Sequence, residues 1–283
     1  MEPILHAAQT YRERVPVPGA ATHVACVWIQ HVRATAPAYV HRTVPNGCIE
    51  LAYRRGADHV SVIGPRHDAA IVLLEPGATV IGVRLHPGAA AEALCVPASE
   101  LLGCTVELTD VWGKPARVLA DRLAEANSPT EAATLLENEV AARVAGRAGR
   151  DPFAAATLDT LHRERNVETR CLAADLFLSD RQFRRRCRTA FGYGAKTMQR
   201  IIRFQRFLAL SWNAENAAPG LAQLALTAGY ADQPHLTREC VALTGLPPSR
   251  FLEETKSSCG PNHDHAATFA PLLRAATVSL NGR

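Results

Sequence analysis

Four arginines are spaced so that they would share one face of a short helix: Arg181, Arg184, Arg185 and Arg188. A guanidinium group donates hydrogen bonds from a rigid planar fork, which matches a phosphate or the O6 and N7 atoms of guanine. Phe183 and Cys187 are spaced to lie on the opposite, buried face of the same helix. This arrangement favours recognition of a nucleic acid.

Positive charge is concentrated around this helix. Residues 170–206 contain ten basic and two acidic residues, a net charge of +8, whereas the whole chain of 283 residues carries +4. The remainder of the chain therefore carries −4. A basic segment in an otherwise acidic chain is the electrostatic footprint expected of a DNA-binding protein. A solvated arginine-rich helix face is the alternative interpretation of the charge alone.

The pattern around the arginines occurs twice, at a constant offset of 53 residues. In each copy an N-cap residue begins a helix of about ten residues, and a glycine ends it in a left-handed conformation. Gln182 would complete a capping box in the first copy. The matching pairs are Ser179 with Asp232, Phe183 with Leu236, Arg185 with Arg238, Cys187 with Cys240, and Gly192 with Gly245.

A second short helix is expected before each of these helices, at 171–176 and at 221–228. Two short helices joined by a tight turn form a helix-turn-helix unit, whose second helix enters the major groove of DNA. The sequence therefore predicts two such units. A long helix between them would hold them apart.

The N-terminal part is predicted to be β-rich. Its apolar and β-branched runs alternate with Pro-Asn-Gly, Gly-Pro and Glu-Pro-Gly turns, which favours a sheet or barrel. These runs are 23–30, 43–56, 59–65 and 69–85. Short helices are expected at 88–102, and two longer helices between 115 and 145, divided near Ser128, which can cap the second of them.

The predicted fold class is α+β, with a barrel-like β-rich domain and flanking helices followed by an all-α domain. We place the first domain at 1–148, the double helix-turn-helix domain at 149–256 and a loosely ordered tail at 257–283. The boundary falls in residues 145–152, Ala-Gly-Arg-Ala-Gly-Arg-Asp-Pro, whose composition is typical of a linker.

Cysteine usage and hydropathy predict a cytoplasmic protein without a metal or cofactor. The eight cysteines form no Cys-x-x-Cys pair, which argues against a disulfide framework and a structural zinc site. The N-terminus lacks the order of a secretory signal, and no run of about 18 apolar residues could span a membrane. We interpret Cys259, His263 and His265 in the tail as a chance cluster. No catalytic site is predicted, so we expect a protein that is not an enzyme.

The helical half resembles the DNA-binding region of AraC-type (AraC/XylS family) transcription regulators over roughly residues 155–253. The resemblance rests on CLAADLFLSDRQFRRRCRTAFG at 171–192, KTMQRIIRFQRFLAL at 196–210 and the specific pattern AGYADQxHLxRE…TGLxP within 228–248. It implies base contacts from Arg181, Arg184, Arg185, Gln233, His235 and Arg238. It also implies phosphate contacts from Ser249 and Arg250, at the N-terminus of a helix that begins near Pro248. Ser179, Arg188 and Lys196 are further candidates for phosphate contacts.

The N-terminal half resembles the effector- or partner-sensing domain of a subset of these regulators, through residues 39–53 and 82–94. Trp28, Tyr39 and Tyr53 are candidate effector-pocket residues, although aromatic side chains in strands are more often core. The expected partners are double-stranded DNA, a small-molecule effector and RNA polymerase, with no membrane. The oligomeric state is left open, with a homodimer as one outcome.

The chain departs from the family pattern at four positions. Phe177 stands where the first turn normally has glycine, which predicts a strained turn. Cys187 and Cys240 replace core aromatic residues, and Ala195 replaces a proline. Three alternatives stay open: a thiol- or soft-metal-responsive regulator that uses Cys187 and Cys240, a DNA-repair-type alkyl acceptor, and a small-molecule-binding module without DNA affinity.

Overall fold

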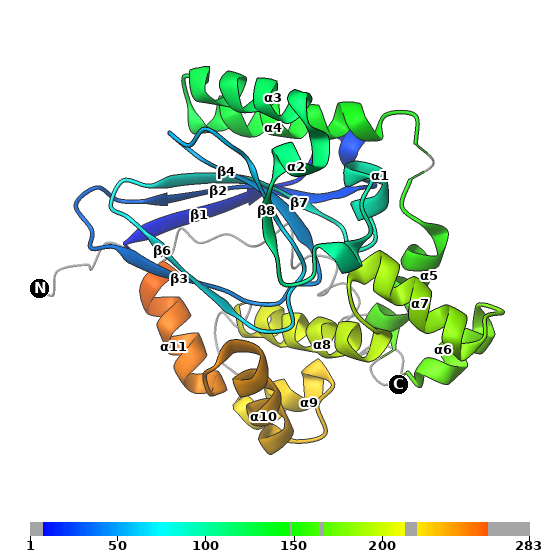
Figure 1. Ribbon diagram of the computed structural model, residues 1–283. Coiled ribbons are helices and arrows are strands. Elements are labelled where there is room, and N and C mark those ends of the chain that lie inside the picture. The colour runs from blue at the N-terminus through cyan, green and yellow to red at the C-terminus, as the bar shows by residue number, and fades with distance from the viewer. Residues whose placement is uncertain (1–7, 148, 165–166, 213–219, 260–283) are drawn as a thin grey trace, which may run out of the picture.

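The computed structural model describes residues 8–147, 149–164, 167–212 and 220–259. The N-terminal part contains a large sheet with helices above it, and the C-terminal helices lie below and beside the same sheet (Figure 1). The strands are β1 (Gln9–Arg14), β2 (Val24–Val32), β3 (Tyr39–Thr43), β4 (Ile49–Arg54), β5 (Ser61–Ile63), β6 (Ala70–Leu74), β7 (Thr79–Leu85) and β8 (Thr105–Glu107).

Six of these strands form one antiparallel sheet in the order β1-β2-β7-β4-β5-β8, and β3 pairs with β6 in a separate two-stranded sheet. The predicted β-rich N-terminal domain is confirmed. The sheet is open, with β1 and β8 at its edges, rather than closed into a barrel.

The two faces of the large sheet differ because successive residues of a strand point to opposite sides. One face is apolar and packs against α3 (Lys114–Glu125) and α4 (Pro129–Val144), which lie above the sheet in Figure 1. The other face carries aromatic and charged side chains and is turned toward β3, β6 and the C-terminal helices.

The predicted helices of the N-terminal part are present. The short ones within 88–102 are α1 (Ala90–Leu94) and the 3-10 helix η2 (Ala98–Glu100). Two further short helices lie outside the predicted ranges: α2 (Leu108–Trp112) and the 3-10 helix η1 (Pro18–Ala20). Ser128 caps α4 as predicted, since its side chain accepts a hydrogen bond from the Glu131 backbone N–H at 3.1 Å. The chain then runs from the end of α4 at Val144 to α5.

The C-terminal part is helical throughout its described residues. Its helices are α5 (Pro152–Arg163), α6 (Thr169–Asp175), α7 (Asp180–Phe191), α8 (Ala195–Trp212), α9 (Leu221–Ala228), α10 (Gln233–Thr244) and α11 (Pro248–Cys259). The pairs α6–α7 and α9–α10 are the two predicted helix-turn-helix units, and α8 is the predicted long helix between them. The last helix continues to Cys259, three residues into the predicted tail, while His263 and His265 lie outside the described residues.

Among the described residues, each part of the chain has its own large hydrophobic core, and a small third cluster of Tyr11, Cys26, Trp28 and Ala52 lies on the other face of the sheet. The first large core comprises buried residues between Ala20 and Val144, and the second comprises buried residues between Phe153 and Phe251. Among the described helices, none is both long enough and apolar enough to cross a membrane.

Candidate nucleic-acid interface and interdomain cavity

The first recognition helix, α7, begins and ends at the residues that the sequence indicates. The Ser179 side chain accepts a hydrogen bond from the Gln182 backbone N–H, and the Gln182 side chain accepts one from the Ser179 N–H at 3.0 Å. Gly192 ends the helix with a φ of 85°. Phe183, Cys187 and Phe191 are buried, which fixes the side of the helix that faces outward.

The arginines on the outward side of α7 are exposed, and none of them forms an ion pair with the described residues. They are Arg181, Arg184, Arg185 and Arg188. Arg186, on the flank of the helix, differs from them. Its Nη2 lies 3.3 Å from Asp151 Oδ1, and its guanidinium lies 4.4 Å from the centre of the Phe153 ring. Through these two contacts Arg186 stabilises the packing of α7 against the start of α5.

The turn before α7 contains the expected strain. Phe177 has a φ of 54°, in the left-handed region that favours glycine, and its side chain is 98% exposed. In the turn of the second unit the left-handed residue is Gly229, one position earlier than the offset of 53 gives, with a φ of 99°.

The second recognition helix, α10, repeats this arrangement with fewer charges. Asp232 Oδ1 accepts a hydrogen bond from the His235 N–H at 2.6 Å, and Gly245 ends the helix in a left-handed conformation. Gln233 and Arg238 are exposed. His235 is only partly exposed, because its ring packs edge-on against Tyr230 at 5.3 Å between ring centres.

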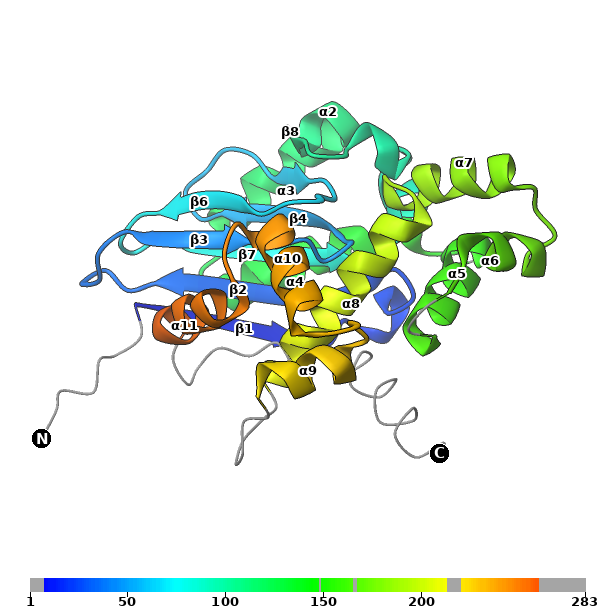
Figure 2. The same cartoon turned by 90° about the horizontal axis from the view of Figure 1, so that it is seen from below.

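The long helix α8 fixes the spacing of the two units. In both views α7 lies toward one end of α8 and α10 toward the other (Figures 1 and 2). Its 18 residues span about 27 Å. Arg200 Nε pairs with Glu239 Oε2 of α10 at 2.7 Å, and Arg206 Nη2 donates to the His162 carbonyl at 2.7 Å. These two arginines of the basic segment, like Arg186, therefore stabilise the fold. The positive charge that DNA can contact is accordingly smaller than the +8 counted for residues 170–206.

The expected phosphate-binding residues lie at the ends of helices. Arg188 and Lys196 are exposed on either side of the turn between α7 and α8. Ser249 and Arg250 are exposed in the first turn of α11, where free backbone N–H groups and the helix dipole favour an anion. Arg250 Nη1 lies 3.1 Å from Glu253 Oε2, and the side chains of both residues are about 70% exposed.

Both core cysteines are shielded. Cys187 and Cys240 are completely buried, and burial raises the pKa of the Cys187 thiol to about 12 and that of Cys240 to about 11. Thiol chemistry proceeds through the thiolate, so these surroundings oppose reactivity. Among the described residues no group of three metal-ligating side chains is present.

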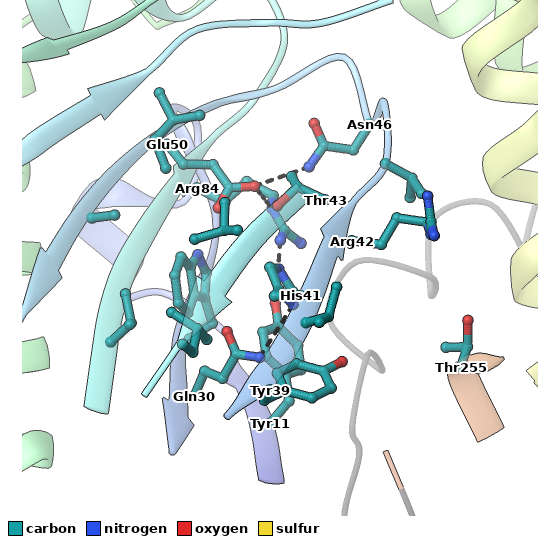
Figure 3. Close-up of a pocket in the computed structure, with 18 of the residues that line it drawn as sticks. Tyr11, Gln30, Tyr39, His41, Arg42, Thr43, Asn46, Glu50, Arg84 and Thr255 are labelled. Atoms are coloured by element: carbon teal, nitrogen blue, oxygen red, sulfur yellow. Dashed lines mark hydrogen bonds and ion pairs between the residues drawn. The ribbon is translucent and has the colours of Figure 1, made fainter. Parts of the chain in front are cut away.

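A cavity of about 210 Å³ lies between the second face of the large sheet, strand β3 and helices α8 and α11. At its floor Arg84 Nε lies 2.8 Å from Glu50 Oε1 (Figure 3). Arg84 Nη1 lies 2.9 Å from Glu13 Oε1, so that Arg84 bridges two buried carboxylates. Asn46 also donates to Glu50 Oε1 at 2.9 Å. Strand register explains the cluster, because Glu50 and Arg84 are directly paired across β4 and β7.

At the rim of the cavity one arginine connects the two parts of the chain. Arg42, on β3, pairs through Nε with Glu254 Oε1 of α11 at 3.0 Å, and its Nη1 donates to the Thr244 carbonyl at the end of α10 at 2.9 Å. Gln205 of α8 adds a hydrogen bond of 2.6 Å to the Pro45 carbonyl. The second helix-turn-helix unit is thus in direct contact with strand β3 of the N-terminal domain.

Two of the three aromatic residues expected at an effector pocket line this cavity. Trp28 and Tyr39 are among its lining residues, whereas Tyr53 is fully buried in the core on the other face of the sheet. Tyr53 does not line this cavity, because Ala52 faces it and a step of one residue along a strand reverses the face.

Sequence reasoning missed the charged residues of the cavity. Arg84 interrupts a mainly apolar run, Thr-Val-Ile-Gly-Val-Arg-Leu, in which a charged residue must find buried partners. That signal alone could have singled out Arg84. Nothing in the sequence indicates that Arg42 and Glu254 meet, since they are 212 positions apart.

Two family models match the chain. Residues 172–254 match the model described as "Helix-turn-helix domain", and residues 12–107 match the one described as "Domain of unknown function (DUF6597)". No curated protein matches the chain.

Among solved structures, the chain is similar to ToxT from Vibrio cholerae O395, at 11% identity and a TM-score of 0.44, covering 87% of this chain and 96% of that chain. It is also similar to unsaturated fatty acid-bound wild-type ToxT from Vibrio cholerae strain SCE256, at 10% identity and a TM-score of 0.41, covering 90% of this chain and 97% of that chain.

Proposed function

We propose that the chain is an AraC-type DNA-binding transcription regulator in which α7 and α10 read two successive major grooves of one duplex. Its residues 172–254 match a helix-turn-helix family model, which supports this function. The observation that carries this proposal is the outward face of α7, where four exposed arginines form no ion pair with the described residues. Successive major grooves are about 34 Å apart, a distance that α8 and the bodies of the two units can span.

Base edges are read by side chains near the beginning of each recognition helix. On α7 these are Arg181, Arg184 and Arg185, which can form bidentate contacts with guanine. On α10, Gln233 and Arg238 are well exposed for this role, while His235 can take part once its ring leaves Tyr230.

Phosphate contacts surround these base contacts. Arg188 and Lys196 flank the first unit, and Ser249 and Arg250 serve the second from the N-terminus of α11. Residues 221–254 contain two basic and four acidic residues, so the second unit carries a net charge of −2. The first unit therefore supplies most of the affinity, because phosphate neutralisation dominates binding strength.

The N-terminal domain controls how the second unit is held. Arg42 donates a hydrogen bond to the end of α10 and forms an ion pair with Glu254 of α11, next to a cavity that an effector can occupy. An effector that contacts α8 and α11 as well as the sheet changes the free energy of this arrangement, and DNA binding then changes effector affinity by the same factor. In this proposal the chain acts by binding, and RNA polymerase is a further partner. Thiol sensing is the second candidate function, and the burial of Cys187 and Cys240 disfavours it.

The test uses the full chain and DNA fragments selected from a genomic library. Arg184→Ala and Arg185→Ala should each weaken binding by about 1–3 kcal/mol and relax base preference at one position, because each removes a bidentate base contact. Arg250→Ala should weaken binding to all sequences alike.

Arg186→Ala is the matched control on the same helix. This change should lower the free energy of unfolding without altering base preference, since Arg186 contacts Asp151 and Phe153. Unchanged affinity in the Arg184 and Arg185 variants would remove α7 from the proposed interface.

A further inference from the structure

The interdomain cavity is lined mainly by aromatic and aliphatic side chains from both parts of the chain. The large sheet contributes Tyr11 and Trp28, which are stacked with 5.9 Å between their ring centres and an angle of 29° between the planes. Helices α8 and α11 contribute Leu208, Trp212 and Phe251. A molecule in the cavity would therefore contact the N-terminal sheet and the C-terminal helices at the same time, largely through apolar surface.

Two carboxylates and two guanidinium groups line the cavity within the described parts of the chain, and they pair with one another. Arg84 Nε lies 2.8 Å from Glu50 Oε1, and both residues are buried. Arg42 Nε lies 3.0 Å from Glu254 Oε1. Each pair is supported by a further hydrogen bond, from Asn46 to Glu50 and from Arg42 to a backbone carbonyl at the end of α10. The charges of the lining therefore balance, two against two.

Two glutamines and the histidine of the lining are also engaged in hydrogen bonds. Gln30 Nε2 donates to Gln9 Oε1 at 2.9 Å and lies 3.2 Å from His41 Nδ1 (Figure 3). An amide N–H group only donates, so His41 Nδ1 accepts this bond and carries no proton, which is the neutral form of the ring. Gln205 Nε2 donates to the Pro45 carbonyl at 2.6 Å.

These pairings disfavour a charged ligand of either sign. An ion that enters the cavity loses its hydration, and each lining charge among the described residues already has a partner of opposite sign. The ion would have to separate one of these pairs to gain a counter-charge, which leaves the other member of the pair unpaired. An uncharged ligand gains the apolar contacts without either cost.

The volume of the cavity limits the size of its ligand. It is about 210 Å³, below the range of about 300–1,000 Å³ that is typical of pockets for drug-sized molecules. A single aromatic ring with a short side chain is therefore the appropriate scale.

The class of ligand rests on the proposed effector control. We propose that the effector is a small uncharged molecule with an aromatic or similarly apolar body, and that the Arg42–Glu254 pair makes the cavity select against carboxylates. The body of the ligand lies between the sheet and α8. Glu254 is then a specificity-determining residue, because it occupies the guanidinium group that a carboxylate ligand would otherwise bind.

Three probes of matched shape test the charge preference: 2-phenylethanol, phenylacetate and 2-phenylethylammonium. Their affinities for the full chain are measured by titration calorimetry without DNA. We expect 2-phenylethanol to bind about tenfold more tightly than either ion, because each ion loses hydration without gaining an unpaired counter-charge. Equal or tighter binding of either ion, or no binding of 2-phenylethanol at millimolar concentration, would overturn the proposal.

Two neighbouring glutamates on α11 provide a matched pair of variants. Glu254→Gln removes the charge that neutralises Arg42, so phenylacetate should bind it several-fold more tightly than it binds wild type, while the affinity for 2-phenylethanol should change little. Glu253→Gln removes the same charge from a side chain that is 69% exposed, pairs with Arg250 and is not among the lining residues. This control should leave all three affinities unchanged.

Each outcome of these titrations decides between the alternatives. Retained binding of 2-phenylethanol by Glu254→Gln shows that the cavity is intact, so an unchanged phenylacetate affinity in that variant would exclude the selecting role of the ion pair. Loss of 2-phenylethanol binding, or the same gain for phenylacetate in Glu253→Gln, would contradict it as well. Since the titrations contain no DNA, a failure of DNA binding alone would overturn only the proposed function.

Discussion

Arg185 and Arg186 are neighbours in the sequence but have different roles. The rotation of about 100° between successive helix residues turns Arg185 toward solvent and Arg186 toward Asp151 and Phe153. Residue type alone therefore does not assign a role to an arginine of this segment. Helix phase, fixed here by buried Phe183 and Cys187, decides which guanidinium groups are available to DNA.

Phe177 is the residue at which local strain can be measured. Phe177→Gly should stabilise the chain by about 0.5–1 kcal/mol, because glycine adopts the left-handed conformation without steric cost and the exposed ring loses no packing. The measurement is the free energy of unfolding in urea. Phe177→Ala, which keeps the strained conformation, is the control and should bring no such gain; equal stability of the two variants would show that the turn is not strained.

At the scale of elements, β3 and the α10–α11 pair form the connection through which the N-terminal domain can act. Arg42 is the side chain that makes it, with one contact on each helix. The α8 helix sets the coarse spacing of the two units, and Arg42 then restricts how far the second unit can rotate about it.

Arg42→Ala should therefore broaden the half-site spacings that the protein accepts. For wild type we expect a steep loss of affinity when one base pair is inserted between the half-sites, and for the variant a loss several-fold smaller. Competition titrations with duplexes of different spacing measure this difference. Arg66→Ala is the control, because Arg66 pairs with Asp68 and contacts the Gly103 carbonyl within the N-terminal domain; the same relaxation in that variant would exclude a role for the β3 connection.

At the scale of the whole molecule, two buried histidines, His86 and His162, lie near the segment that connects the domains. Burial lowers the pKa of His86 to about 4, and burial together with the charge of Arg206 lowers the pKa of His162 to about 4. Arg150, in the connecting segment, adds positive charge near both histidines. Protonation of either ring would place a further positive charge beside these arginines.

The free energy of unfolding should therefore decrease as the pH falls from about 6.5 toward 4, because the unfolded chain, with histidine pKa values near 6.5, binds protons that the folded chain excludes. Thermal unfolding followed at a series of pH values measures this. His162→Asn should show a shallower decrease over the same interval, and a decrease as steep as that of wild type would assign the acid sensitivity to other groups.

Much of the C-terminal part was predictable because its elements carry local signals. Ser179, Asp232, Gly192 and Gly245 define helix ends through their own side chains or their own backbone freedom, so neighbouring residues suffice to locate α7 and α10. The strand β1, Gln-Thr-Tyr-Arg-Glu-Arg, was missed because two of its buried residues, Gln9 and Glu13, are polar, so it lacks an apolar alternation. The cavity was missed for a different reason, since contacts such as Arg42 with Glu254 arise only when the two parts of the chain meet.

The central claim is that α7 and α10 occupy two successive major grooves of one duplex, and methylation interference on a selected DNA fragment tests it most directly. Methylated guanine N7 atoms should block binding in two clusters about one helical turn apart. In Arg185→Ala the interference should disappear from one cluster only. A single cluster, or interference that Arg185→Ala leaves unchanged, would contradict the two-groove arrangement.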